Sequence, residues 1–339
     1  MKASDLAVSS ASLLSRIGNT KMLKIYLQIN ASWMPVYLKL EGGNPAGSSK
    51  DRSAMALIID LEERGLINSS SIIVESTSGN LGVALAFFCR ELGYPFLAVI
   101  DPKTTPEIRA RMAGFGAQLE LITEPDETGG YLFSRIRRIR ELCDSSSRYV
   151  WTDQYSNDAN PRAHYSSMAP EIYRQMGGRV DAIFISVSTG GTLAGVGQYF
   201  REVSPATQVI GVDAQGSVVF TDAPGSRKLT GIGSSRKSSF IRPGHFNDYI
   251  LVNDAQAFAM CRRMDEAISL KLGGSSGAAV FACAQYLQSH PELKNSVCIC
   301  PDNGTSYEST IFNRNWLDLN GCRDLSSTSF VKKIAFAPK

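Results

Sequence analysis

The sequence has few of the residues that build metal sites and disulfide scaffolds. It contains only 3 histidines, and its 7 cysteines include no Cys-x-x-Cys pair. Zinc sites in proteins usually draw on such spacings, so the pattern predicts no metal site. An odd number of cysteines, most of them inside apolar runs, is typical of reduced thiols that pack as small hydrophobic groups. We therefore expect a protein of a reducing compartment, the cytoplasm.

Long apolar runs and an excess of one charge are also absent. The 339 residues carry 35 Lys and Arg against 32 Asp and Glu, a formal net charge of +3. This balance argues against nucleic acid or an anionic membrane as a partner. No stretch approaches the roughly 18 apolar residues that a membrane-spanning helix needs, and no secretory signal is predicted. The composition favours a globular enzyme of one large or two moderate domains that acts on small molecules.

Short β-rich segments alternate with longer helical ones along the chain. The predicted strands are Val36–Leu40, Ser71–Ser76, Phe96–Ile100, Gln118–Ile122, Tyr149–Thr152, Ala182–Val187, Val209–Asp213, Tyr249–Val252 and Val297–Cys300. The predicted helices are Lys50–Gly65, Leu81–Leu92, Pro106–Phe115, Tyr131–Cys143, Arg162–Met176, Leu193–Val203, Ala255–Leu270 and Gly277–Ser289. This alternation predicts an α/β fold of parallel sheets covered by helices, with ligands at the carboxyl ends of strands. The Ser/Thr-biased tail from about Arg323 is expected to be loosely ordered.

One lysine lies between a turn rich in glycine and serine and an apolar helical run. Lys50 stands in the segment Asn44–Arg52, shortly before Ala54–Ile59. Burial there would lower the pKa of the lysine, because desolvation disfavours the ammonium form. A neutral amine can form a Schiff base with the aldehyde of pyridoxal phosphate (PLP). The alternative is a solvated lysine at the start of a helix, and further segments are needed to choose between the two.

A second segment has the composition of a phosphate-binding loop. Ser188–Thr192 follows an apolar strand and begins a helix. Its glycines let backbone amides turn toward an anion, and the helix N-terminus adds unpaired N–H groups and partial positive charge. The spacing matches neither the dinucleotide-binding pattern nor a Walker loop. Many glycine-rich turns bind nothing, so this loop alone does not decide the function.

Two more segments begin helices with hydroxyl groups. Ser76–Gly82 offers hydroxyls and amides that suit a carboxylate, while simple helix capping by Ser78 or Asn80 is the alternative. Gly273–Ala279 contains Ser275, which is either an N-cap or a partner for a pyridine nitrogen. In the predicted α/β fold, all these segments lie at the carboxyl ends of strands, where loops meet helix N-termini and ligands bind.

Together, the motifs resemble those of the fold type II PLP-dependent enzymes, the family of cysteine synthase and cystathionine β-synthase. The resemblance covers about Ser15 to Asn315. It implies PLP as the cofactor, a homodimer, and a two-domain fold like that of tryptophan synthase β, with open twisted sheets flanked by helices. It also implies a larger PLP-binding domain over 1–44 and 156–320, a smaller mobile domain over 45–155, and a C-terminal tail over 321–339.

The same resemblance implies roles for single residues. Lys50 would hold PLP and act as the acid-base group, and Asn80 would contact both cofactor and substrate. The implied cofactor-binding residues are Lys50, Asn80, Ser188, Thr189, Gly190, Gly191, Thr192 and Ser275. The implied substrate-binding residues are Ser76, Thr77, Ser78, Asn80, Gln154, Arg135, Tyr155, Ser188 and Arg236.

Departures from the cysteine synthase pattern indicate a particular branch of the family. The phosphate loop begins with Ser188 in place of glycine, and Gly231–Arg236 replaces the usual Gly-Ile-Gly-Ala-Gly-Phe. With Glu124–Tyr131 and Val212–Val218, these segments resemble the branch that makes N-(2-amino-2-carboxyethyl)-L-glutamate. That resemblance implies β-replacement on O-phosphoserine through an aminoacrylate, with glutamate as the nucleophile, on the way to 2,3-diaminopropionate and a siderophore or peptide antibiotic.

Several alternatives stay open at this point. Arg135 fits a phosphate leaving group, since a guanidinium donates paired hydrogen bonds to phosphate oxygens, but the cluster Arg135–Arg140 also reads as a solvated helix face. Arg236 is a weaker candidate for the carboxylates of glutamate. The main alternative function is cysteine synthase, with O-acetylserine or O-phosphoserine and sulfide. A cyanoalanine synthase, a PLP-fold regulatory protein and a nucleotide-binding oxidoreductase are further alternatives, the last disfavoured by its missing motif.

Overall fold

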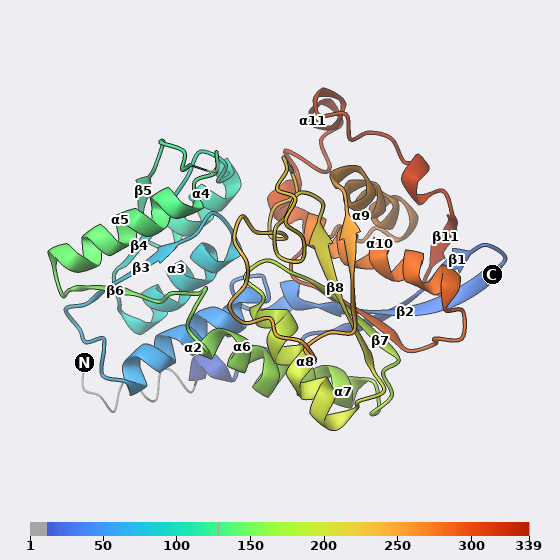
Figure 1. Cartoon of the computed structure of the whole chain (residues 1–339), viewed down its shortest axis with the longest axis horizontal. Helices are drawn as coiled ribbons and strands as arrows, with labels where there is room; N and C mark the ends of the chain where they lie inside the picture. The colour runs from blue at the N-terminus through green and yellow to red at the C-terminus, as the bar shows by residue number, and fades with distance from the viewer. Residues whose placement is uncertain (1–11, 128, 339) are drawn as a thin grey trace. The chain divides into compact units, whose positions relative to one another are not determined.

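The computed structural model describes residues 12–127 and 129–338, and the chain forms two compact units (Figure 1). Unit 1 holds the described part of Met1–Gly18 together with Asn44–Ala163. Unit 2 holds Asn19–Gly43 and the described part of His164–Lys339. Three segments that the sequence predicts for the larger domain lie in unit 1: residues 12–18, Asn44 and residues 156–163.

Unit 1 is built on a four-stranded parallel sheet with the order β5-β4-β3-β6. Its strands are β3 (Ile72–Ser76), β4 (Phe96–Ile100), β5 (Gln118–Leu121) and β6 (Tyr149–Trp151). Its helices are α2 (Lys50–Glu63), α3 (Asn80–Leu92), α4 (Pro106–Gly114), α5 (Leu132–Ser145) and α6 (Ala159–Ala163). Helices α2, α3 and α4 form one apolar core with the sheet, and α5 contributes Ile139 and Leu142 to a separate apolar cluster with β3 and β4.

Unit 2 is built on a seven-stranded mixed sheet with the order β11-β1-β2-β10-β7-β8-β9. Its strands are β1 (Met22–Ile29), β2 (Ser32–Leu40), β7 (Ala182–Ser186), β8 (Gln208–Ala214), β9 (Asp248–Val252), β10 (Ser296–Cys300) and β11 (Val331–Ala335). Its α-helices are α7 (Ala169–Gln175), α8 (Gly191–Val203), α9 (Asp254–Ile268), α10 (Gly274–Ser289) and α11 (Arg314–Leu319). The five strands from β2 to β9 are parallel, whereas β1 runs antiparallel between β2 and the edge strand β11.

The structure corrects two expectations about the course of the chain. The tail was expected to be loosely ordered, but its strand β11 pairs with β1, and Val331 and Ile334 are buried. These two apolar residues cover the edge of the sheet, which explains why a Ser/Thr-rich tail is ordered here. The predicted helix Arg162–Met176 is three pieces: the end of α6, a π-helical turn His164–Met168, and α7, which has Pro170 in its first turn.

The described residues form neither a membrane-spanning helix nor a cluster suited to a metal ion. Within the described ranges, no helix is both long and apolar enough to cross a bilayer. The same ranges hold no group of three or more His, Cys, Asp or Glu side chains placed to bind a metal ion. All seven cysteines are present as thiols, and burial raises the pKa of the Cys261 thiol to about 12.

Candidate active site

The predicted site residues divide between the two units, and each set is described within its own unit. Unit 1 carries Lys50, Ser76, Thr77, Ser78, Asn80, Arg135, Gln154 and Tyr155. Unit 2 carries Ser188, Thr189, Gly190, Gly191, Thr192, Arg236 and Ser275. In unit 1 most of them follow the carboxyl ends of β3 and β6, as the α/β pattern predicts.

Lys50 is the first residue of α2 and is half-buried rather than exposed. Two side chains hold the backbone of the preceding turn by hydrogen bonds. The carboxylate of Asp51, itself fully buried, accepts from the backbone N–H of Ala46 at 2.5 Å. Arg111 Nη2 donates to the carbonyl of Ala46 at 2.6 Å, beneath Gly47, whose φ of +89° requires glycine. The start of α2, and with it the backbone of the lysine, is therefore fixed by buried polar contacts.

The side chain of Thr77 connects the loop between β3 and α3 to the first turn of α3. Thr77 Oγ1 accepts from the backbone N–H of Gly82 at 2.9 Å. The N-cap residue of α3 is Gly79, and no side chain caps that position. The capping alternative that the sequence raised for Ser78 or Asn80 therefore fails, because Thr77 serves the helix N-terminus instead. Ser78 is exposed and Asn80, half-buried, is the first residue of α3.

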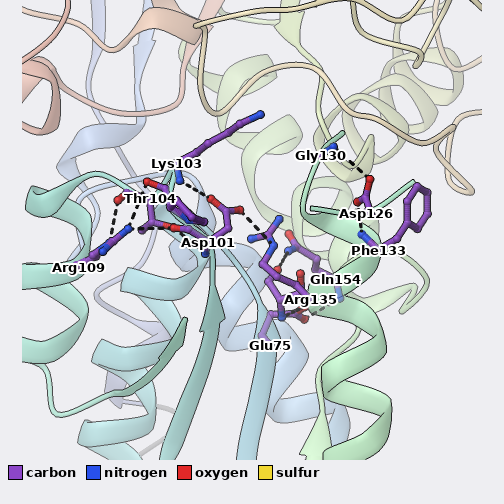
Figure 2. A network of polar contacts seen from close by, with 12 residues as sticks. Glu75, Asp101, Lys103, Thr104, Arg109, Asp126, Gly130, Phe133, Arg135 and Gln154 are labelled. Atoms are coloured by element: carbon purple, nitrogen blue, oxygen red, sulfur yellow. Dashed lines mark hydrogen bonds and ion pairs between the residues drawn. The ribbon is translucent and has the colours of Figure 1, made fainter. Parts of the chain in front are cut away.

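A buried glutamate joins this loop to the segment after β6 (Figure 2). Glu75, at the end of β3, accepts from the backbone N–H of Gln154 at 3.1 Å and from the side chains of Trp151 and Thr152. Gln154 Nε2 donates in turn to the carbonyl of Ser76 at 3.0 Å. Burial raises the pKa of the Glu75 carboxyl to about 7, although the hydrogen bonds that it accepts oppose this shift.

Sequence reasoning missed Glu75, although one feature of the sequence points to it. It is an acidic residue in a strand that otherwise begins with the apolar run Ile72, Ile73 and Val74. A charged residue in a central strand buried on both faces needs several partners. Tyr155, which directly follows the glutamine, is half-buried on the same segment.

Arg135 is buried, in contrast to its neighbours in the basic cluster. The residue is 6% exposed, whereas Arg137 and Arg140 on the same helix are exposed. Its Nε lies 3.4 Å from Asp101 Oδ2, just past the end of β4 (Figure 2). Its Nη1 is buried and has no hydrogen-bond partner among the described residues. The solvated-surface interpretation is therefore wrong for Arg135 and right for Arg137 and Arg140.

The segment before α5 sets the position of this arginine. Asp126 accepts from the backbone N–H groups of Gly130 at 3.2 Å and Phe133 at 3.0 Å (Figure 2). These contacts place a carboxylate at the N-terminus of α5, where the helix dipole stabilises negative charge. Arg135 follows in the first turn of α5, and its backbone N–H donates to the backbone carbonyl of Tyr131. Thr128, in the same predicted motif, lies outside the described residues.

In unit 2, the predicted phosphate loop leads into α8. Gly190 is the N-cap residue of this helix, with a φ of +92°. A Cβ atom at this position would overlap the hydroxyl of Ser238, which donates to the carbonyl of Thr189 at 2.6 Å. Ser188 Oγ donates to the carbonyl of Gly233 at 3.0 Å. The loop conformation therefore requires glycine at position 190 and is held by two serine hydroxyls.

The other predicted residues of unit 2 lie at helix starts or in a loop. Thr192 Oγ1 lies 3.3 Å from Nε2 of the fully buried His164. Ser275 is buried in the first turn of α10, and its carbonyl accepts from the hydroxyl of Ser186. Arg236 is half-buried in the long loop between β8 and β9. The N-cap residue of α10 is Gly273, so Ser275 does not cap this helix by its side chain.

These residues fit PLP. The N-terminus of α8 offers backbone N–H groups and a partial positive charge to a phosphate, and the glycine at 190 leaves no side chain over the loop. Ser275 supplies a hydroxyl that suits a pyridine nitrogen, and Lys50 supplies an amine on a rigid turn.

Comparison with known proteins also indicates PLP as the cofactor. A family model described as pyridoxal-phosphate dependent enzyme matches residues 13–302. The chain belongs to the family of pyridoxal-phosphate dependent enzymes. An O-acetylserine dependent cystathionine β-synthase from Helicobacter pylori is 30% identical, with a TM-score of 0.81, over 88% of this chain and 97% of that one. O-ureido-L-serine synthase is 29% identical, with a TM-score of 0.81, over 88% and 94%. A hydrogen sulfide-producing enzyme from Fusobacterium nucleatum is 28% identical, with a TM-score of 0.79, over 87% and 96%.

Membership of this family confirms three predictions made from the sequence. The fold class is α/β with sheets flanked by helices, the protein is an enzyme, and its cofactor is PLP. The roles of single residues stay predictions, as do the leaving group and the nucleophile.

Proposed function

We propose that this enzyme replaces the phosphate of O-phospho-L-serine with L-glutamate, giving N-(2-amino-2-carboxyethyl)-L-glutamate and inorganic phosphate. The observation that supports a phosphate leaving group best is the burial of Arg135. A buried guanidinium is costly unless its N–H groups are paired. Asp101 lies beside Nε, and Nη1 is buried without a protein partner in the described chain. An anionic substrate group would satisfy that nitrogen.

The carboxylate of the amino acid has a proposed place on the β3–α3 loop. Thr77, Ser78 and Asn80 offer hydroxyl, amide and backbone N–H groups at the start of a 13-residue helix. The helix dipole favours an anion there. Gln154, which is fixed to the carbonyl of Ser76, would complete the contacts from the neighbouring segment.

The remaining roles concern the cofactor and proton transfer. When bound, PLP supplies an electron sink that allows loss of the α-proton and departure of the β-substituent. Lys50 would hold the cofactor covalently and move the proton with its Nζ. Ser188–Thr192 would bind the phosphate of PLP and Ser275 its ring nitrogen. A hydroxyl partner leaves that nitrogen largely unprotonated, which suits β-elimination. Arg236 would receive a carboxylate of the incoming glutamate.

Cysteine synthase activity is the second candidate, and the comparisons favour it. One relative is named an O-acetylserine dependent cystathionine β-synthase and another a hydrogen sulfide-producing enzyme. A sulfur nucleophile needs no pocket for two further carboxylates. The burial of Arg135 favours a phosphate leaving group over acetate, because the acetyl ester carries no charge for the guanidinium to neutralise. It does not separate glutamate from sulfide as the nucleophile, since either could react after loss of phosphate from O-phosphoserine.

The test is the mass of the product formed from O-phosphoserine in a mixture of glutamate, sulfide and other amines. We expect the glutamate adduct and one phosphate per turnover, and loss of both in Lys50→Ala. Arg135→Gln should lower kcat/KM about 100-fold with O-phosphoserine and less than about threefold with O-acetylserine. Arg137→Gln, an exposed arginine of the same helix, is the matched control. Preference for sulfide by orders of magnitude would refute the proposal.

Two further features belong to this proposal. We expect a homodimer in solution, which light scattering would test at micromolar concentration. We also expect a cytoplasmic enzyme that supplies a precursor of 2,3-diaminopropionate for siderophore assembly. Deletion of the gene should then be rescued by added diaminopropionate, and failure of that rescue would argue against this setting.

A further inference from the structure

Glu75 makes four hydrogen bonds that converge on one carboxylate. Oε1 accepts from the backbone N–H of Ser76 at 2.7 Å and from Trp151 Nε1 at 3.1 Å. Oε2 accepts from the hydroxyl of Thr152 and from the backbone N–H of Gln154 at 3.1 Å. The side chain is fully buried, so no solvent competes for these donors. A buried polar network that is satisfied in this way makes the segments that it joins rigid.

The donors come from two segments that are far apart in sequence. β3 and β6 are neighbours in the sheet, with Val74 opposite Trp151. Beyond this register point β3 continues into the loop Thr77–Asn80, and β6 continues into Gln154. Glu75 accepts from the backbone N–H of Ser76, the last residue of β3, and from that of Gln154, three residues past the end of β6. Gln154 Nε2 closes the ring by donating to the carbonyl of Ser76.

We infer that Glu75 is a positioning residue for the substrate carboxylate site, because it fixes the separation between the β3–α3 loop and Gln154. This inference rests on the proposed role of that loop, though not on the identity of the nucleophile. Glu75 contacts neither substrate nor cofactor in this scheme. It acts through the backbone of Ser76 and Gln154, so that the hydroxyls of Thr77 and Ser78 and the amide of Gln154 face one ligand.

Glu75→Gln is the informative substitution because it keeps the shape of the side chain. A carboxylate has two acceptor oxygens, whereas an amide has one oxygen and one NH2 group. Whichever way the amide is turned, its NH2 meets a backbone N–H, that of Ser76 or that of Gln154. One segment is then released. The loss of a hydrogen bond to a charged group corresponds to about 10-fold to 100-fold in binding.

The first measurement uses the full-length enzyme with PLP bound and no nucleophile. It is made at about pH 8, above the pKa of about 7 to which burial raises the Glu75 carboxyl, so that the side chain is ionised. The absorbance of the cofactor is followed during titration with O-phosphoserine and, separately, with O-acetylserine. In Glu75→Gln the half-saturating concentration of both donors should rise about 10-fold to 100-fold. The turnover rate at saturation, measured separately with the nucleophile added, should change less than about threefold, because the carboxylate is bound equally in ground and transition states. The matched control is Glu62→Gln, whose carboxylate accepts from Tyr94 at 3.0 Å elsewhere in unit 1.

The second measurement is hydrogen exchange of the same holoenzyme, which does not depend on activity. Amides of residues 76–80 and 153–157 should exchange about tenfold faster or more in Glu75→Gln. They should be unchanged in Glu62→Gln. If Glu75→Gln does not fold, Thr152→Val keeps the carboxylate and removes one donor, and should show both effects at about threefold.

Three outcomes would overturn the inference. One is an unchanged half-saturating concentration, and another is unchanged exchange in both segments. The third is a loss confined to the turnover rate, which would indicate a role in the transition state. If wild type shows no cofactor band at all, the proposed function fails, while the exchange data still report on Glu75.

Discussion

The stability of this enzyme should fall with rising pH because of Glu75, and a single substitution isolates the effect. The folded structure removes this carboxyl from water and raises its pKa from 4.5 to about 7. Below pH 4.5 the group is protonated in both states. Between these values the unfolded chain loses the proton and the folded protein keeps it, so unfolding releases a proton and rising pH favours unfolding. Above about pH 7 the contribution stays constant.

The magnitude follows from the separation of the two pKa values. Each pKa unit corresponds to about 1.4 kcal/mol, so the full contribution is about 3 kcal/mol. Most of it, about 2–3 kcal/mol, is expressed between about pH 5 and about pH 8. In Glu75→Gln there is no proton to lose, and this component disappears. Other groups, such as Asp213 with a pKa raised to about 6 by burial, contribute equally to both proteins and cancel in the difference.

The assay is urea denaturation of wild type and Glu75→Gln across this pH range, with the fluorescence of Trp151 as the reporter for unit 1. The free energy of unfolding of wild type minus that of the variant should decrease by about 2–3 kcal/mol from about pH 5 to about pH 8. Parallel pH profiles would show that the carboxyl titrates normally and refute the reasoning. An increase with pH would mean that the hydrogen bonds outweigh desolvation and stabilise the charged form.

Two further predictions concern unit 2. Gly190→Ala places a methyl group at φ +92° against Ser238, and should weaken PLP binding about tenfold or more in a cofactor titration, with circular dichroism unchanged. Normal cofactor affinity would show that the loop is not the phosphate site. Lys39→Met leaves the carboxylate of Glu171, now 2.8 Å from the buried Lys39 Nζ, without its ion pair, and should destabilise unit 2 by about 3–5 kcal/mol in thermal unfolding. A decrease in the free energy of unfolding of less than about 1 kcal/mol would contradict this, because it would mean that the pair is as weak as a surface salt bridge.

The parts of the fold that could be predicted from the sequence are those that depend on local sequence patterns. Strand-helix alternation located β3 and β7, and the glycine-rich turn after β7 located the start of α8, because backbone conformation there depends on neighbouring residues. Contacts between distant segments could not be predicted in this way. Lys39 pairs with Glu171 across 132 positions, and the edge strand β11 pairs with β1 across most of the chain. Nothing local to a short Ser/Thr-rich tail indicates that its two apolar residues complete a sheet.

The burial of Arg135 could have been predicted from the helical periodicity of its segment, although its partner could not. In α5 the buried positions Leu132, Ile136, Ile139 and Leu142 follow the spacing of one helix face, and Arg135 lies three residues after the first of them. A basic residue on the apolar face differs from its exposed neighbours by its position on the helix. The sequence-based prediction singled out Arg135 for its resemblance to a family motif and left its burial open. What the periodicity could not supply is the partner, because Asp101 follows a strand more than thirty residues earlier. The helix face predicts that this arginine is buried. Only the fold shows that Asp101 lies beside Nε and that Nη1 has no hydrogen-bond partner among the described residues.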